Sequence, residues 1–102
     1  MEAKGPRISF KAKIWLYEGK ATWHFVTLPK GESAKLKKVF GGMKRGWGSL
    51  PVTATLGKTQ WRTSIFPDSK RGAYLLPLKT EVRRSEKAAA GDSRVFQIEL
   101  RL

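Results

Sequence analysis

The chain contains no cysteine, and His24 is its single histidine. Thiol catalysis, thiolate zinc sites and histidine-rich metal clusters are therefore excluded. No apolar run approaches the ~18 residues of a membrane-spanning helix, and no apolar segment typical of a signal peptide follows the N-terminus. We expect a cytoplasmic protein without a membrane span, a metal site or a cofactor.

The residues that are present suffice for one compact domain. The 102 residues are 40% hydrophobic and include five Phe, four Trp and two Tyr. A chain of this size buries roughly 60–70% of its unfolded surface, so one core can form without disulfides or metals. We expect a tail over residues 1–7, a single domain over 8–102, and a monomer.

Acidic residues are few and unevenly placed. Lys and Arg number 21 against 8 Asp and Glu, which gives a net charge of +13. No acidic residue occurs from Ser33 to Pro67, and this span contains seven of the basic residues: Lys35, Lys37, Lys38, Lys44, Arg45, Lys58 and Arg62. Such a block attracts nucleic acid or an anionic membrane surface. Solubility is the alternative explanation for a lysine excess.

Alternating hydrophobicity predicts two hairpins. Apolar residues fall at every second position over 8–16, and an aromatic and β-branched segment, 22–28, follows a turn at Glu18-Gly19-Lys20. A second pair of alternating segments, 52–56 and 61–65, is joined at Gly57-Lys58.

Two short helices and two more strands complete the expected elements. Leu36, Val39 and Phe40 have helical spacing, which predicts a helix over 34–40 capped by Ser33 and ended by Gly41-Gly42. A second helix is expected from Thr80, as its cap, to about Ala89. The expected strands are 73–76, stopped by Pro77, and 96–102.

A weak internal repeat suggests how these elements close. Each half reads as a strand ending in Leu-Pro, a short helix and a second strand, with the Leu-Pro pairs at Leu28-Pro29 and Leu76-Pro77. Two such halves would bury their apolar faces against each other around a pseudo-twofold axis. The predicted fold is all-β: a closed six-stranded barrel from two pseudo-repeated halves, with two short helices.

Three segments carry a resemblance to a known family: 60–67 (QWRTSIFP), 72–79 (GAYLLPLK) and Val82-Arg83-Arg84. Over about residues 8–102 the chain resembles the bacterial and archaeal family called domain of unknown function 1905. The resemblance implies a small closed β-barrel similar to the double-split barrels of AbrB-type transcription regulators, here with both halves in one chain. Arg94 departs from the aliphatic residue usual in the family, so the last strand should enter the core one pair later.

The resemblance supplies a fold and no chemistry, because the family has no established activity. Some relatives continue into a bacteriocin-protection segment, which implies an accessory role in envelope or peptide-stress tolerance. In the chain itself, His24 has no orienting partner nearby in sequence, and Ser49 and Ser64 have no nucleophile motif. The glycines of 46–49 lack the spacing of a phosphate loop. We therefore expect a non-enzymatic domain.

The leading functional hypothesis is nucleic-acid binding, to RNA or DNA, without strong sequence choice. Cations that follow phosphates beside an aromatic that stacks on a base are typical of single-strand binding. The candidates are Lys35, Lys37, Lys38, Lys44, Arg45 and Trp47, with Arg83, Arg84 and Lys87, whose placement resembles the basic element of AbrB-type proteins. Alternatively, Trp47 covers one end of the barrel and the second helix presents a solvated face.

The alternative hypothesis is a small-molecule or carbohydrate binding module. Trp61, Arg62, Thr63 and Tyr74 combine flat apolar rings with polar tips, as ligand pockets do. Core packing with one surface arginine would also explain them. A concave pocket of at least ~300 Å³ beside these residues distinguishes the two.

Overall fold

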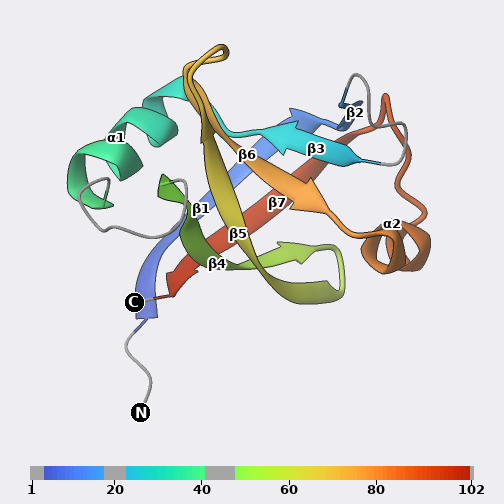
Figure 1. Cartoon of the computed structure of the whole chain (residues 1–102). Coiled ribbons are helices and arrows are strands. Elements are labelled where there is room, and N and C mark those ends of the chain that lie inside the picture. Colours follow the sequence, from blue (N-terminus) through green and yellow to red (C-terminus); the bar gives the residue numbers. More distant parts are fainter. Residues whose placement is uncertain (1–3, 18–22, 41–47, 102) are drawn as a thin grey trace.

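The computed structural model describes residues 4–17, 23–40 and 48–101. Within these ranges the fold is mostly β, with seven antiparallel strands and two helices (Figure 1). The elements are β1 (Lys4–Lys13), β2 (Trp15–Leu16), β3 (His24–Thr27), α1 (Lys30–Phe40), β4 (Leu50–Leu56), β5 (Thr59–Asp68), β6 (Ala73–Leu78), α2 (Thr80–Glu86) and β7 (Ser93–Arg101). They form one curled sheet in the order β1-β7-β4-β5-β6-β3-β2.

The structure does not show the predicted closed six-stranded barrel. The segment expected as one strand over 8–16 is divided at Ile14 into β1 and β2, which stand at the two ends of the strand order. β1 pairs with β7 along its length, whereas β2 pairs with β3. Between them, the Ile14 N–H donates to the Asp92 carbonyl at 2.9 Å, and its carbonyl accepts from the Gly91 N–H at 2.8 Å. The backbone of Ile14 is thus tied to the loop before β7, and the result is a curled half-barrel with β1 and β2 at its two edges.

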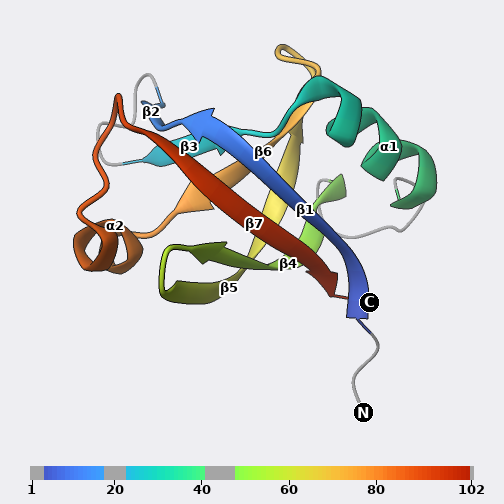
Figure 2. The same cartoon turned by 180° about the vertical axis from the view of Figure 1, so that it is seen from behind.

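The long strand β5 connects the two parts of this sheet. It pairs with β4 over Thr59 to Ile65, as the predicted second hairpin requires, and with β6 over Phe66 to Asp68. The corresponding strands of the two predicted halves lie side by side, since β3 pairs with β6 and β4 pairs with β7. Figure 2 shows the same curled sheet from behind, where its strands β1 and β7 run side by side across the front of the view.

The first helix begins at Lys30, directly after Pro29, so Ser33 is not its N-cap. Ser33 is buried in the first turn, where its Oγ accepts a hydrogen bond from the Tyr74 N–H at 3.0 Å. This bond attaches α1 to β6 and gives the backbone N–H of Tyr74 an acceptor. The second helix also differs from expectation: Lys79 is its N-cap, and it ends at Lys87, which has a left-handed φ of 50°.

The inner face of the sheet forms a single core. In β7 the alternating residues Phe96, Ile98 and Leu100 are 0%, 0% and 2% exposed. Arg94, one inward position earlier, instead donates to the Glu86 carbonyl at 3.1 Å. The buried series therefore begins at Phe96, as expected from the departure at Arg94.

Candidate functional site

The predicted basic residues that the structure describes fall into two separate groups. Lys35, Lys37 and Lys38 are exposed on α1, and Lys35 lies 3.9 Å from the Glu32 carboxylate. The other group, Arg83, Arg84 and Lys87, belongs to α2 and its C-terminal end. Figures 1 and 2 both place α1 and α2 at opposite ends of the molecule. The remaining candidates, Lys44, Arg45 and Trp47, lie outside the described residues.

The predicted ligand set does not surround one cavity either. Trp61 and Tyr74 are 8% and 3% exposed and belong to the core. Arg62, the neighbour of Trp61 along β5, is exposed, because successive residues of a strand point to opposite faces. Core packing with one surface arginine is therefore the better description of these residues.

The structure instead brings aromatic residues together on the outer face of the β2-β3-β6 part of the sheet. Trp15 lies directly opposite Phe25, Phe25 opposite Pro77, and Phe66 opposite Leu75. Directly paired residues share a face, as do residues two apart along a strand, so Leu75 and Pro77 join the pairs into one apolar row. Phe25 and Leu75 are buried, yet neither belongs to the core cluster beneath the sheet.

Two further rings enlarge this row at the sheet edge. The Tyr17 N–H donates to the Trp23 carbonyl at 2.9 Å, which places the two residues opposite each other beyond β2 and β3. The ring centroids of Tyr17 and Trp23 are 6.0 Å apart, and each is within 6.3 Å of Phe25. These contacts hold the rings in an ordered cluster, although Tyr17 is 40% exposed and Trp23 52% exposed.

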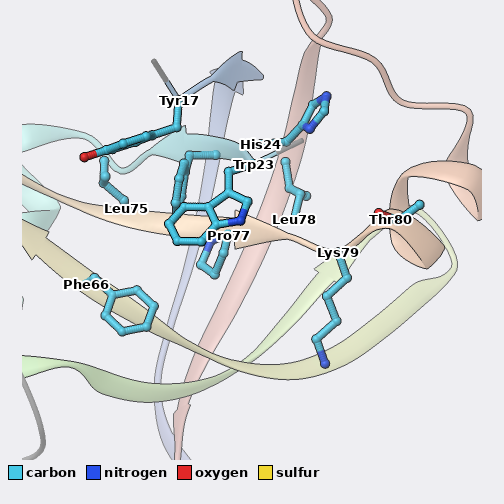
Figure 3. Close-up of a pocket in the computed structure, with 10 residues that line it drawn as sticks. Tyr17, Trp23, His24, Phe66, Leu75, Pro77, Leu78, Lys79 and Thr80 are labelled. Atoms are coloured by element: carbon cyan, nitrogen blue, oxygen red, sulfur yellow. The ribbon is translucent and has the colours of Figure 1, made fainter. Parts of the chain in front are cut away.

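The exposed parts of these rings line a groove with a volume of about 1020 Å³, which we call the aromatic groove. Its lining residues are Tyr17, Trp23, His24, Phe25, Phe66, Leu75, Pro77, Leu78, Lys79 and Thr80. Figure 3 shows Tyr17 on one side, Lys79 and Thr80 on the other, and Trp23 between them. The groove is therefore apolar along its length and carries a cation at one end.

The other end of the groove adjoins a polar cavity of about 540 Å³, which we call the turn pocket. The two share Tyr17 and Leu75, and the turn pocket adds Pro67, Asp68, Ser69, Lys70 and Arg71 from the turn between β5 and β6. A third, smaller cavity shares Pro67, Asp68 and Ser69 with the turn pocket and reaches Lys37 on α1. The groove and the turn pocket are thus neighbours, whereas the third cavity lies on the α1 side of the same turn, lined by Ser33 and Tyr74.

Two side chains that line these hollows have shifted pKa values. The hydrogen bond from the Arg71 side chain holds the pKa of Asp68 below its ordinary value, so this carboxylate is ionised and engaged near neutral pH. Burial raises the pKa of the Tyr74 phenol, in keeping with its place in the core.

Within the described residues no group of three or more His, Asp and Glu side chains could hold a metal ion. Neither helix described has the length and apolar character needed to cross a membrane.

Comparison with models of protein families assigns most of the chain to one family. The model of the family described as "Domain of unknown function (DUF1905)" matches residues 10–98. The chain belongs to the DUF1905 family. This membership confirms the resemblance inferred from the sequence. A search of curated proteins gave no match for this DUF1905 chain.

Sequence reasoning missed the aromatic groove of this DUF1905 domain, although a signal for it exists. Trp15 and Tyr17 precede the turn predicted at Glu18-Gly19-Lys20, and Trp23 and Phe25 follow it, in each case two residues apart. Aromatics at alternate positions on each arm of a hairpin share one face when the register pairs them, as it pairs Trp15 with Phe25. Phe66 of β5 and Leu75 of β6 lie on the same outer face, but their place there depends on the register between strands distant in sequence.

Proposed function

We propose that this domain is a non-catalytic module that binds single-stranded nucleic acid along the aromatic groove, with little choice of sequence. The observation that carries the proposal is a row of exposed rings with cations at both ends, Lys79 at one and Lys70 with Arg71 at the other. Every base has a flat face that can stack on such rings, and phosphates are attracted to the flanking cations.

Charge complementarity favours nucleic acid over an uncharged partner. The net charge of +13 gives the whole surface an attraction for polyanions. At the turn between β5 and β6, Lys70 and Arg71 add cations directly beside the groove. Within the lining of the groove and the turn pocket, Asp68 is the acidic residue, and it is engaged by Arg71.

The rings also favour single strands over duplexes. In a duplex the base faces are stacked on one another, so an exposed ring such as Trp23 can reach them only after unstacking. A single strand offers its bases directly. We expect a 12-nucleotide oligothymidylate to bind more tightly than a duplex of equal length.

The test is a titration of the full chain with fluorescein-labelled 12-nucleotide DNA and RNA, followed by anisotropy. If about five phosphates are neutralised, log K falls with log salt at a slope of roughly −3.5. Trp23→Ala should weaken binding by roughly 5- to 150-fold, since stacking contributes about 1–3 kcal/mol per base. Val95→Ala, which changes an exposed residue on β7 outside the groove, is the matched control and should have no effect.

Absence of binding at 50 mM salt would reject this function, and so would equal affinity of the Trp23→Ala and Val95→Ala proteins for the labelled strands. Binding that does not change with salt would also reject it, because phosphate contacts require counterion release.

The size and apolar lining of the groove support one alternative, a carbohydrate or other small neutral ligand. A volume of about 1020 Å³ is at the upper end of the ~300–1,000 Å³ usual for ligand pockets. Such a ligand would stack on Trp23 and Tyr17 without using Lys70 or Arg71. Saturable quenching of tryptophan fluorescence by a neutral sugar, independent of salt, would favour this alternative.

A further inference from the structure

The turn pocket differs in chemistry from the groove beside it. The groove presents rings, whereas the turn pocket presents the Ser69 hydroxyl, the Lys70 ammonium and the Arg71 guanidinium. Tyr17 borders both. A ligand that spans this border would place a flat apolar part and an anionic part on adjacent surfaces.

The turn that forms this pocket is held by Asp68. One carboxylate oxygen of Asp68 accepts the Lys70 N–H at 3.0 Å, and its carbonyl accepts the Gly72 N–H at 2.8 Å. Gly72 has a φ of 63°, a left-handed conformation that favours glycine. The backbone that carries Ser69 and Lys70 is therefore shaped before any ligand arrives.

Arg71 is fixed on two sides. Its Nη1 donates to the second carboxylate oxygen of Asp68 at 2.6 Å, and its guanidinium carbon lies 4.1 Å from the centroid of the Trp15 ring. Trp15 is held in turn, because its indole N–H donates to the Thr27 hydroxyl at 2.9 Å. A guanidinium carries five N–H donors, so one bond to Asp68 leaves donors for a further anion.

The carboxylate of Asp68 does not make the pocket acidic. Both of its oxygens accept hydrogen bonds from the turn, and the pocket also contains two cations, Lys70 and Arg71. A planar guanidinium held against an aromatic ring is well suited to paired hydrogen bonds with phosphate oxygens.

We infer that the turn pocket binds the phosphate of a nucleotide whose base stacks on Tyr17 in the aromatic groove, with Arg71 as the main phosphate contact. This inference rests on the proposed function and assigns a subsite within it. The minimal ligand is then a nucleoside monophosphate rather than a nucleoside. Both a terminal phosphate and a backbone phosphate offer the oxygens that the pocket requires.

The test compares thymidine, thymidine 5′-monophosphate, thymidine 3′-monophosphate and inorganic phosphate as ligands of the full chain, by NMR titration of the tryptophan indole N–H signals. At least one monophosphate should bind about tenfold or more tightly than thymidine, the range of charge-assisted hydrogen bonds. The preferred isomer shows on which side of the base the pocket lies. Oligothymidylates with and without that terminal phosphate then distinguish a terminal from a backbone phosphate.

Arg71→Gln should remove the preference for the monophosphate, and Lys70→Gln should reduce it without disturbing the Trp15 contact. Lys11→Gln, which removes one positive charge from an exposed position of β1 outside both hollows, is the control. Equal binding of thymidine and both monophosphates would overturn the inference. So would equal behaviour of the Arg71, Lys70 and Lys11 variants, or inorganic phosphate binding as tightly as the nucleotides.

The two proposals fail separately. If labelled oligonucleotides bind and Trp23→Ala weakens them, but Arg71→Gln does not alter the phosphate preference, the turn pocket is wrong and the groove stands. If no oligonucleotide binds, both are wrong.

Discussion

The two parts of the sheet share one core but have different outer faces. Outside the β1-β7-β4 part, cross-strand pairs are polar: Arg7 lies opposite Glu99, and Ser9 opposite Gln97. Outside the β2-β3-β6 part, the corresponding positions carry Trp15, Phe25 and Pro77. A sheet needs only one apolar face to fold, as the polar part demonstrates. The aromatic outer face is therefore not needed to form the sheet, and it is the apolar surface on which the proposed binding function rests.

The comparison is sharpest between inner and outer aromatics. Phe96→Ala, on the inner face at 0% exposure, should reduce the free energy of unfolding by about 3–5 kcal/mol. Trp23→Ala, at 52% exposure, should cost much less, because about half of this residue is already in contact with solvent in the folded state. Urea denaturation followed by circular dichroism measures both. Similar losses would mean that the outer rings are part of the folding core.

The glycines of the two turns provide the next largest difference. Gly57, in the polar part, has a φ of 58°, and a methyl group added there would meet the Glu86 carboxylate. Gly72, beside the turn pocket, has a φ of 63° with open space around it. Gly57→Ala should therefore cost about 1–3 kcal/mol and exceed Gly72→Ala, whose cost comes from the backbone alone. Thermal unfolding of both variants tests this, and the reverse order would contradict the contact with Glu86.

A pH dependence should mark the turn beside the groove. The Arg71 hydrogen bond lowers the pKa of Asp68 from 3.8 in the folded state. Its stabilising effect is therefore fully present above about pH 4 and is lost as the pH falls through the lowered value. Asp68→Asn should be less stable than the parent chain at pH 6, with a smaller difference at pH 3. Urea midpoints at the two pH values measure this, with Glu81→Gln on α2 as the control.

The smallest effect is expected on the polar outer face. Arg7 Nε and a Glu99 oxygen are 2.7 Å apart, but the Arg7 side chain is 60% exposed. Such pairs contribute about 0.2–1 kcal/mol and are screened by salt. Glu99→Gln should shift the urea midpoint slightly at low salt and not at all at 1 M salt. A larger loss would show that this face is as important for folding as the inner one.

Local patterns predicted most of the elements of this domain, but not how they close. The alternation over 52–56 and 61–65 is visible in sequence because both strands lie with one face on the core. The same alternation over 8–16 could not reveal the change of partner at Ile14, which depends on Gly91 and Asp92 far along the chain. The prediction for Ser33 was wrong for a similar reason. Serine is a common N-cap residue, but the Ser33 hydroxyl instead accepts a hydrogen bond from the Tyr74 N–H on β6.

The candidate site depended still more on the tertiary structure. Composition revealed the cationic excess, and the residue pattern revealed the family. The lysines of α1 and the arginines of α2 were both candidates for nucleic-acid contact, yet the two helices lie at opposite ends of the molecule. Trp61 and Tyr74 looked available to a ligand, yet both are in the core.

The amino-acid sequence by itself determined the net charge of +13, the strand-forming segments and the family, because these follow from composition and short-range periodicity. Only the tertiary structure decided that Trp15, Phe25 and Phe66 share an outer face and that Arg71 lies against Trp15. The reason is physical: a face or a groove is made by the register between strands distant in sequence, and register arises when the whole sheet packs.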